Sequence, residues 1–341
     1  MLHPLPELEL REAVDIVRDW SPLRGARIFI TGGTGFIGKW LIEVLGKAER
    51  TFDLGVEAVV LSRDPAAFLD TMPHLRELPW LTFQQGDITS FRVPDGAFSH
   101  LIHGAASSDA RDYRNDPATM RETITTGARH TMEALSKQAG LRILFLSSGA
   151  VYGAQPPDLT HIPEDFPLAL DTDDPSQAYA QGKREAERII TAASDAFGFE
   201  PTIARCFAFA GPHLPLDQHF AFGNFIRDAL AGNPVQVQGD GSPFRSYLYA
   251  SDLAAWLWIL FIHGDSRTYH VGSDQDLTIL ELAHAIGEAA GVPVDLQSEP
   301  VPGRPSSRYV PAVTRISEAF GLRPSVDLPA AIRRTLQWHR G

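Results

Sequence analysis

Along the first 200 residues, compact apolar runs alternate with stretches in which apolar residues recur every three or four positions. A run that is apolar at nearly every position is typical of a strand buried on both faces, whereas the wider spacing indicates an amphipathic helix. Strands that alternate with helices favour a parallel sheet with right-handed crossovers. The pattern therefore predicts an α/β protein with a doubly wound parallel sheet. The expected strands are 26–31, 57–61, 81–85, 100–103, 142–147 and 201–207, and the expected helices are 39–45, 117–139 and 177–197.

This alternation ends near Gly211-Pro212. Beyond that point the pattern predicts helices at 220–231 and 251–261 and a short strand at 235–237, and ahead of the sheet it predicts an amphipathic helix at 8–20. We expect three parts. They are an N-terminal helical extension over 1–24, a first α/β domain over 25–211, and a smaller C-terminal α/β domain over 212–341, some segments of which return to the first domain.

Composition narrows the class of protein. Apolar residues make up 44% of the 341 positions and charged residues 21%, which are ordinary values for a folded globular chain. Thirty basic against 42 acidic side chains give a net charge of −12. Because that charge repels polyanions, we expect the protein to bind neither nucleic acid nor a membrane surface.

The cysteine count and the apolar stretches bear on location. The single cysteine, Cys206, forms no internal disulfide, which fits a reducing compartment. The first residues are acidic and lack the apolar core of a secretory leader, and the longest apolar stretch, 253–263, is about half of a membrane span. We therefore expect a soluble, cytoplasmic protein.

A glycine cluster follows the first predicted strand, in the segment Thr31-Gly-Gly-Thr-Gly-Phe-Ile-Gly38. Glycines at this spacing allow a tight turn, close approach of the backbone to a pyrophosphate, and close packing of helix on strand. The helix N-terminus would then hold the phosphate. A plain tight turn would also explain such a cluster, but its place between the first strand and the first helix favours a dinucleotide site.

The end of the second predicted strand bears on which dinucleotide binds. An NAD site usually has an acidic residue there that accepts bonds from the ribose hydroxyls, whereas an NADP site has groups that tolerate a phosphate. Ser62 and Arg63 stand at this position, so we favour NADP(H), with NAD as the alternative. Asp64 would supply the acid if the strand ended one or two residues later, and Arg63 would then be a solvated loop residue.

Tyr179 and Lys183 are four positions apart in a predicted helix, so their side chains share a face. A neighbouring cation favours the phenolate and brings a tyrosine pKa from about 10 toward the range of a general acid or base. The pair alone is common on exposed helix faces. A preceding strand ends in serines, however, and Ser148 could donate to the substrate oxygen on which Tyr179 acts.

Taken in order, these motifs resemble those of the extended short-chain dehydrogenase/reductase family, the NAD(P)-dependent nucleotide-sugar epimerase/dehydratase/reductase group. The resemblance runs from about residue 26 to the C-terminus. It implies a Rossmann domain for NAD(P), a smaller C-terminal domain for a nucleoside-diphosphate sugar, and a homodimer. The motifs that carry it are TGGTGFIG, Gly86-Asp87-Ile88, His103-Gly-Ala-Ala106, SSGAVYG, YAQGK, Arg205 through Gly211-Pro212, and 239–249.

The resemblance also implies roles for single residues. Ser148, Tyr179 and Lys183 would be the catalytic triad, in which the tyrosine exchanges a proton with the sugar oxygen and the lysine also holds the nicotinamide ribose. Arg245 matches an arginine that meets the substrate diphosphate, although a structural salt bridge with Asp252 would also explain it. The implied cofactor residues are Gly32, Gly35, Phe36, Ile37, Gly38, Ser62, Arg63, Asp87, Ile88, Ala105, Ala106, Tyr179 and Lys183, and the implied substrate residues are Ser148, Ala208, His213, Asn224 and Arg245.

The sequence departs from the family pattern at three positions. Gly149 and Ala150 stand where dehydratases of this group carry an Asp-Glu pair and where decarboxylases carry a nearby Glu. Ala150 also lacks the cysteine of the enzymes that combine 3,5-epimerisation with reduction, although His213 matches their catalytic histidine. A loop residue is the commoner interpretation of His213. Ala208 replaces an asparagine that often holds substrate.

These departures remove the usual route to elimination and leave hydride transfer. We favour reduction of a nucleoside-diphosphate 4-keto-(6-deoxy)hexose with Tyr179 as general acid, and the alternative is a C4 epimerase with tightly bound NAD. A 4,6-dehydratase, a decarboxylase and a non-catalytic dinucleotide-binding protein rank lower. The histidines follow no metal-ligand spacing, so we expect no metal.

Overall fold

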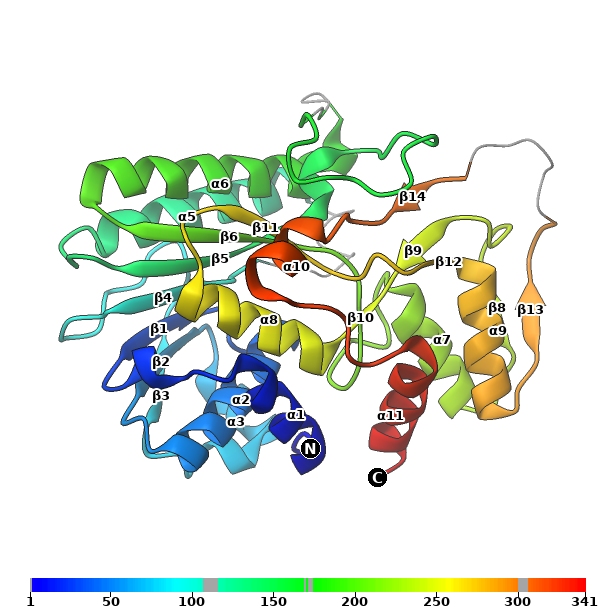
Figure 1. Ribbon diagram of the computed structural model, residues 1–341, viewed down its shortest axis with the longest axis horizontal. Helices are drawn as coiled ribbons and strands as arrows, with labels where there is room; N and C mark the ends of the chain where they lie inside the picture. Colours follow the sequence, from blue (N-terminus) through cyan, green and yellow to red (C-terminus); the bar gives the residue numbers. More distant parts are fainter. Residues whose placement is uncertain (1, 107–115, 169, 171–173, 300–305) are drawn as a thin grey trace.

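The computed structural model describes residues 2–106, 116–168, 170, 174–299 and 306–341. Seven strands form a central sheet in the order β11-β6-β5-β4-β1-β2-β3, and every pairing in it is parallel (Figure 1). The chain winds outward in both directions from β1, which confirms the doubly wound α/β fold. The strands are β1 (Arg27–Thr31), β2 (Glu57–Ser62), β3 (Leu81–Gln85), β4 (His100–His103), β5 (Arg142–Ser148), β6 (Glu200–Cys206) and β11 (Thr268–Val271).

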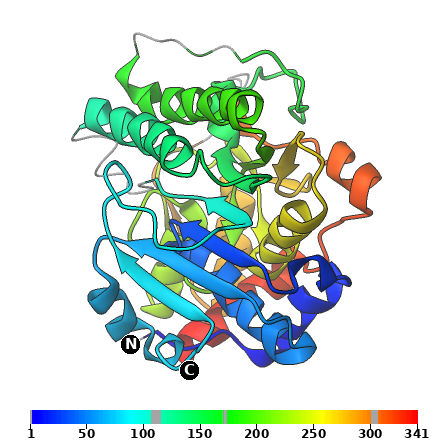
Figure 2. The same cartoon turned by 90° about the vertical axis from the view of Figure 1, so that its left-hand side faces the viewer.

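Helices cover both faces of this sheet (Figure 2). In β1, Ile28 and Ile30 join the hydrophobic core on the side of α2 and α8, while Phe29 between them joins the core on the side of α5 and α6. Because side chains alternate along a strand, a run that is apolar at each position feeds both cores. The helices are α2 (Phe36–Phe52), α3 (Pro65–Thr71), α5 (Pro117–Ala134), α6 (Ala178–Phe197) and α8 (Ala250–His263).

Several predicted helices have different bounds in the structure, and two illustrate the difference. The helix predicted at 117–139 ends at Ala134, because the amides of Ser136 and Gln138 beyond it donate to carbonyls three residues back, in turns rather than in an α-helix. The helix predicted at 251–261 extends over Ala250–His263, and its residues from Ala250 to Ile262 are all buried. Apolar periodicity identified both elements but not their ends.

The chain after β6 forms a second core around α7 (Ala221–Leu230), α9 (Ile279–Ala290) and α11 (Leu328–Arg340). Figure 1 shows this part at the right-hand end of the molecule, next to three short sheets. β11 and α10 (Thr314–Phe320) lie back against the first sheet. The short strands pair as β8 (Val235–Val237) with β13 (Val294–Leu296), β7 (Phe209–Ala210) with β10 (Leu248–Tyr249), and β9 (Phe244–Ser246) between β12 (Asp276–Thr278) and β14 (Arg308–Tyr309).

The N-terminal segment touches both parts. Its helix α1 (Glu7–Val17), predicted at 8–20, packs on α8 and α2. Glu9 accepts a hydrogen bond from Tyr249 at 2.8 Å, and Glu12 pairs with Arg334 of α11. The segment therefore ties the end of α11 to the sheet. Short 3-10 helices complete the fold at η1 (Ser21–Leu23), η2 (Pro73–Leu75), η3 (Gly149–Tyr152) and η4 (Pro175–Gln177).

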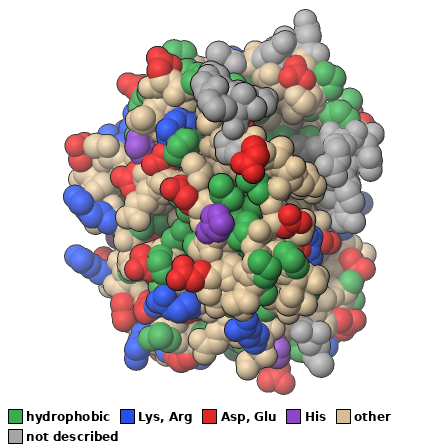
Figure 3. Space-filling view, turned by 90° about the vertical axis from the view of Figure 1, so that its right-hand side faces the viewer, with side chains coloured by type: hydrophobic (Ala, Val, Ile, Leu, Met, Phe, Trp, Pro, Cys, Tyr) green, Lys and Arg blue, Asp and Glu red, His purple; other side chains and the backbone are tan. Residues whose placement is uncertain are grey.

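The surface and the helix lengths bear on the expected partners. On the face drawn in Figure 3, Lys and Arg side chains are interspersed with Asp and Glu rather than gathered into one basic patch. Within the described part of the chain, every helix is too short or too polar to cross a lipid bilayer.

Candidate active site

The turn between β1 and α2 leaves no room for side chains. Gly32 has φ +77°, and a Cβ there would lie 2.5 Å from the carbonyl carbon of Gly104. A Cβ on Gly38 would lie 2.4 Å from the Cα of Gly33. Glycine is thus required at both positions, one for the turn against the next strand end and one for close packing of helix on turn.

The first amides of α2 face this turn without a side-chain cap. Gly35 is the N-cap and has none to offer, so the amides of Phe36, Ile37 and Gly38 are uncapped by side chains. A helix N-terminus of this kind favours a phosphate, both through its N–H groups and through the helix dipole. The cradle therefore fits the pyrophosphate of a dinucleotide.

The structure places β2 one residue longer than the sequence predicted. β2 ends at Ser62, and one oxygen of the Asp64 carboxylate accepts the amide of Ala67 as the N-cap of α3. Asp64 thus lies two residues beyond the strand end. Arg63 is exposed beside Asp87, whose pKa is lowered mainly by hydrogen bonds from Thr89 and further by the Arg63 charge. Hydroxyl and guanidinium groups occupy the end of this strand.

The ends of β3 and β4 complete the cofactor side. Asp87 follows β3, and Ile88 lies against Gly127 of α5, where a Cβ would be 2.9 Å from the Ile88 side chain. The Ala105 amide donates to the Thr31 hydroxyl at 3.3 Å, which brings the loop after β4 onto the glycine turn. Ala106 packs on the core beneath α5 and α6. These residues line up at the carboxyl ends of neighbouring strands, where open α/β sheets bind ligands.

β5 and α6 carry the three residues of the predicted triad. Ser148 is the last residue of β5, and Tyr179 and Lys183 lie one turn apart at the start of α6. The Lys183 ammonium lies 5.9 Å from the centre of the Tyr179 ring and donates to the Leu146 carbonyl of β5 at 2.8 Å. The shared helix face predicted from the spacing is therefore present.

Lys183 is buried, and burial lowers its pKa to about 8, although the neighbouring Cys206 and Glu187 oppose that shift. A lysine with this pKa is cationic at neutral pH and loses its charge in mildly alkaline solution. The same burial raises the pKa of the Cys206 thiol to about 12, so Cys206 is not a nucleophile. The charge at the site is thus carried by Lys183.

Tyr309 of β14 is a site residue that the sequence did not reveal. Its hydroxyl lies 3.5 Å from the Ser148 hydroxyl and donates to the Cys206 carbonyl at 3.4 Å. Burial raises its pKa above the ordinary range, and the neighbouring Tyr179 adds to that shift. Tyr309 therefore brings a neutral hydroxyl to the triad. Its segment has no periodicity or motif that would have marked it.

The residues after Ser148 carry no acid. Gly149 and Ala150 begin the 3-10 helix η3, and the Ala150 amide donates to the Ser148 hydroxyl. A Cβ on Gly149 would lie 2.6 Å from the Phe207 ring, so a longer side chain there would have to displace that ring. The position therefore has neither a carboxylate nor room for one.

The predicted substrate residues differ in their burial and in their hydrogen-bond partners. Arg245 of β9 is half-buried, and burial lowers its pKa while Tyr247 and Tyr309 oppose the shift. Within the described residues it forms no salt bridge, because Asp252 instead accepts from Ser325 and Val326. The salt-bridge interpretation of Arg245 is thus wrong. Two further positions are half-buried: Ala208, between β6 and β7, and Asn224 of α7, which accepts from Arg227.

His213 is not where a substrate contact would be. Its ring is fully buried, lies 3.3 Å from the Glu43 carboxylate and stacks edge-on against Trp338. The prediction of His213 as a substrate residue is therefore corrected. A loop histidine after Gly-Pro looked available, but α11 and the N-terminal segment cover it. Glu43 also accepts the Leu5 amide.

Metal chemistry finds no support in the described ranges. No group of three or more His, Cys, Asp or Glu side chains among them is arranged to hold a metal ion. His103 is fully buried, bonded to the Thr31 hydroxyl at 3.0 Å, and burial lowers its pKa to about 3. It is a packed strand-end residue, as the sequence suggested.

A protein-family model also matches the sequence of this chain. The model described as "NAD dependent epimerase/dehydratase family" matches residues 28–272. The chain belongs to this family. Its members are NAD-dependent by that description, and the extended short-chain dehydrogenase/reductase resemblance is confirmed.

Curated members of the epimerase/dehydratase family are similar over most of this chain. UDP-glucuronic acid decarboxylase 5 of Arabidopsis thaliana is 29% identical over 316 residues, which covers 90% of this chain and 89% of the relative. A dTDP-glucose 4,6-dehydratase of Streptomyces niveus is 26% identical and covers 92% and 93%. The relatives' names agree on nucleotide sugars and differ on the reaction.

Solved structures agree with the fold. A Thermus thermophilus UDP-glucose 4-epimerase in complex with NAD has a TM-score of 0.74 at 26% identity, and the match covers 92% of this chain and 99% of that one. The epimerase Mth375 of Methanothermobacter thermautotrophicus has a TM-score of 0.78 at 21% identity, and that match covers 96% and 95%. The family's coarse activity is therefore NAD-dependent chemistry on nucleotide sugars.

Proposed function

We propose that this protein reduces a nucleoside-diphosphate 4-keto-(6-deoxy)hexose by hydride transfer, with Tyr179 as the general acid. The observation that supports the proposal is that Tyr179 lies beside Lys183 on α6, while Gly149 and Ala150, which carry no acid, follow Ser148 at the end of β5. Hydride transfer needs Ser148, Tyr179 and Lys183. Elimination of water or carbon dioxide needs, by the family's usual route, an acid where Gly149 and Ala150 stand.

The end of β2 supports NADPH as the reductant. Ser62 and Arg63 offer a hydroxyl and a cation for a 2′-phosphate, and the Asp64 carboxylate is engaged with the Ala67 amide. A reductase must exchange its cofactor at each turnover, and cells keep NADPH reduced for such steps. NAD remains the cofactor named for the family, so the preference for the phosphate is part of the proposal.

The chain's own residues account for the proton. Ser148 donates a hydrogen bond to the C4 ketone oxygen, and Tyr179 delivers its proton to that oxygen as the alcohol forms. When bound, the reduced nicotinamide supplies the hydride to C4. The Lys183 ammonium stabilises the resulting phenolate of Tyr179. Arg245 faces the diphosphate as a fixed cation.

C4 epimerisation is the second candidate. It uses the same three residues and likewise needs no acid after Ser148, and one structural neighbour at 26% identity is a UDP-glucose 4-epimerase with NAD. The two candidate reactions differ in whether the cofactor is exchanged at each turnover. An epimerase keeps its NAD because the hydride leaves and returns, whereas a reductase consumes a reduced cofactor.

The test supplies purified protein with UDP- or dTDP-4-keto-6-deoxyglucose and either NADPH or NADH. We expect loss of nicotinamide absorbance with NADPH and a new C4 alcohol by NMR, and neither in Tyr179→Phe. Conversion of UDP-glucose to UDP-galactose with NAD alone would replace the reductase by the epimerase. Release of carbon dioxide from UDP-glucuronic acid would overturn both. We also propose a homodimer, which light scattering after gel filtration would test.

A further inference from the structure

A row of polar side chains crosses the sheet next to the triad. In the strand register, Ser147 of β5 is opposite Arg205 of β6, and Arg205 is opposite His270 of β11. All three are buried, with 7% of Arg205 exposed. Cross-strand partners share a face of the sheet, so Arg205 lies between a neighbour of Ser148 and the returning strand.

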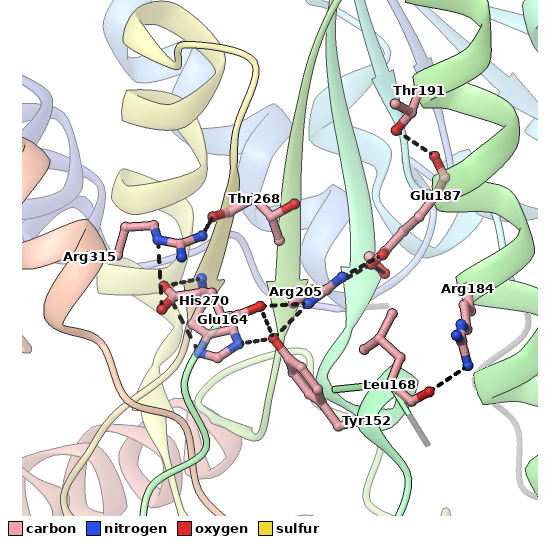
Figure 4. Close-up of polar contacts among 11 residues, drawn as sticks. Tyr152, Glu164, Leu168, Arg184, Glu187, Thr191, Arg205, Thr268, His270 and Arg315 are labelled. Atoms are coloured by element: carbon pink, nitrogen blue, oxygen red, sulfur yellow. Dashed lines mark hydrogen bonds and ion pairs between the residues drawn. The ribbon is translucent and has the colours of Figure 1, made fainter. Parts of the chain in front are cut away.

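Arg205 is held on one side by the catalytic helix. Its Nε and Nη2 donate to the two carboxylate oxygens of Glu187 at 2.9 and 2.7 Å, a two-bond pair drawn in Figure 4. Glu187 lies one turn beyond Lys183 on α6 and also accepts from the Ser147 hydroxyl at 2.6 Å. One buried carboxylate thus joins α6 to both β5 and β6.

On its other side Arg205 begins an ordered chain of hydrogen bonds. Its Nη1 donates to the Tyr152 hydroxyl at 2.6 Å, because a guanidinium can only donate. His270 Nδ1 lies 2.8 Å from the Ala312 carbonyl, which can only accept, so Nδ1 carries the proton of this neutral imidazole. His270 Nε2 then accepts the Tyr152 proton at 2.7 Å. The Glu164 carbonyl, 3.2 Å from the Tyr152 hydroxyl, is a second and longer acceptor for the same proton.

The far end of this chain reaches the segment of Tyr309. Ala312 is three residues beyond Tyr309, and its amide and the Val310 carbonyl bond to Ile162 on the loop that follows η3. Figure 4 shows Glu164 of that loop beside Tyr152, and the Glu164 carbonyl accepts from Arg205 at 3.3 Å. Arg205 therefore has contacts leading to α6 and to the segment of Tyr309, and through Glu187 to the end of β5.

We propose that Arg205 is a positioning residue for hydride transfer: through Glu187 it aligns α6 with the end of β5, and through Tyr152 and His270 it aligns the segment of Tyr309. The inference rests on the proposed use of Ser148, Tyr179 and Lys183. A buried ion pair contributes little net stability compared with apolar residues of the same volume. Its contribution here is geometric, since reacting groups displaced by about 1 Å lose about 100-fold in rate.

The kinetic test compares Arg205→Gln and Arg205→Lys with Arg334→Gln. Arg334 also forms a two-bond pair with a glutamate, Glu12, but between α11 and α1. We expect Arg205→Gln to lower kcat about 100-fold with KM nearly unchanged, and Arg205→Lys to restore about tenfold of that loss. Arg334→Gln should keep the wild-type kcat. An Arg205→Gln enzyme with wild-type kcat per folded molecule would overturn the inference.

Tyr152→Phe provides a milder variant that leaves the Arg205–Glu187 pair intact. The variant lacks one hydroxyl. We expect faster amide hydrogen exchange in residues 309–312 and unchanged exchange at the start of α6. Arg205→Gln should speed exchange at both places. These exchange measurements need no substrate, so they test the positioning even if the wild-type protein turns over none of the sugars offered. Unchanged exchange at 309–312 in both variants would refute the second arm of the proposal.

Discussion

The cofactor side and the substrate side of the site are built in different ways. On the cofactor side, one continuous segment, 31–38, forms the turn and the helix start, and the strand ends that follow come in chain order. On the substrate side, Ser148, Arg245 and Tyr309 come from β5, β9 and β14. The first is local in sequence, and the second exists only through tertiary pairing.

The two sides also differ in how well they tolerate substitutions. A Cβ at Gly32 or Gly38 meets backbone atoms within 2.6 Å, which cannot move without the strand or the helix. The short strands around Arg245 and Tyr309 are two or three residues long and pair only with one another. We therefore expect substitutions on the cofactor side to be poorly tolerated. Substrate specificity should be determined by the residues of the substrate side.

The largest effect should come from Tyr179→Phe, which removes the proton donor shared by both sides. We expect kcat to fall by about 100- to 10,000-fold, because general acid catalysis contributes that much. Cofactor affinity, measured by nicotinamide fluorescence, should change little. Tyr269→Phe is the matched control, since its buried hydroxyl bonds to Asp265 away from the triad. Full activity of Tyr179→Phe would show that another group delivers the proton.

The cofactor side alone is tested by Gly38→Ala. The added methyl would lie 2.4 Å from the Gly33 Cα, so α2 must move away from the turn. Overpacking of this kind costs about 1 to 3 kcal/mol, and we expect cofactor binding weakened about tenfold to 100-fold by calorimetry. Gly46→Ala, on the same helix with only the Trp80 ring at 3.1 Å, should bind cofactor normally. Equal losses in both variants would point to global destabilisation instead.

The sequence predicted the strand, turn and helix of the cofactor side. Strand, glycine turn and helix are consecutive, and their spacing carries a physical requirement that a reader can state before seeing the fold. It also brought Tyr179 and Lys183 together, because helical spacing determines which side chains share a face. The predicted strand 57–61 stopped one residue short of the observed β2, which ends at Ser62, and only the structure could show that Asp64 caps α3.

The substrate side could not be predicted to the same extent. Tyr309 reaches Ser148 because β14 pairs with β9, a contact between residues far apart in the chain that no local pattern encodes. The prediction for His213 was wrong for the converse reason. Its local sequence suggested an open loop, but Trp338 and Glu43, from the last and the second helix of the described fold, enclose it. Burial of a loop residue depends on elements that arrive later in the chain.

Tyr309→Phe tests whether the substrate side contributes to chemistry or only to shape. The hydroxyl lies 3.5 Å from Ser148 and stays protonated, since burial raises its pKa; its proton goes to the Cys206 carbonyl, so its oxygen is an acceptor beside Ser148. We expect kcat/KM to fall about three- to tenfold, the effect of one hydrogen bond of about 1 kcal/mol. Cofactor affinity should be unchanged. A variant as active as the wild type would reduce Tyr309 to a packing residue against Phe207.

The smallest effect on turnover should come from Glu9→Gln, in the N-terminal helix α1 that contacts both parts of the fold. This substitution should instead change the pH dependence of stability. Burial raises the pKa of Glu9 to about 7, with Tyr249 donating to its carboxylate. Since the folded state binds this proton more tightly than the unfolded chain, the stability it confers at low pH is lost as pH rises through about 7.

Between pH 5 and pH 8 we expect the wild-type protein to lose about 2 kcal/mol of unfolding free energy through Glu9, and Glu9→Gln to lose none of it. Denaturant titrations at the two pH values measure the difference. Glu7→Gln, on the same helix with an exposed carboxylate paired to Lys47, should keep the wild-type pH dependence. If Glu9→Gln keeps the wild-type pH dependence too, a group other than Glu9 causes that dependence.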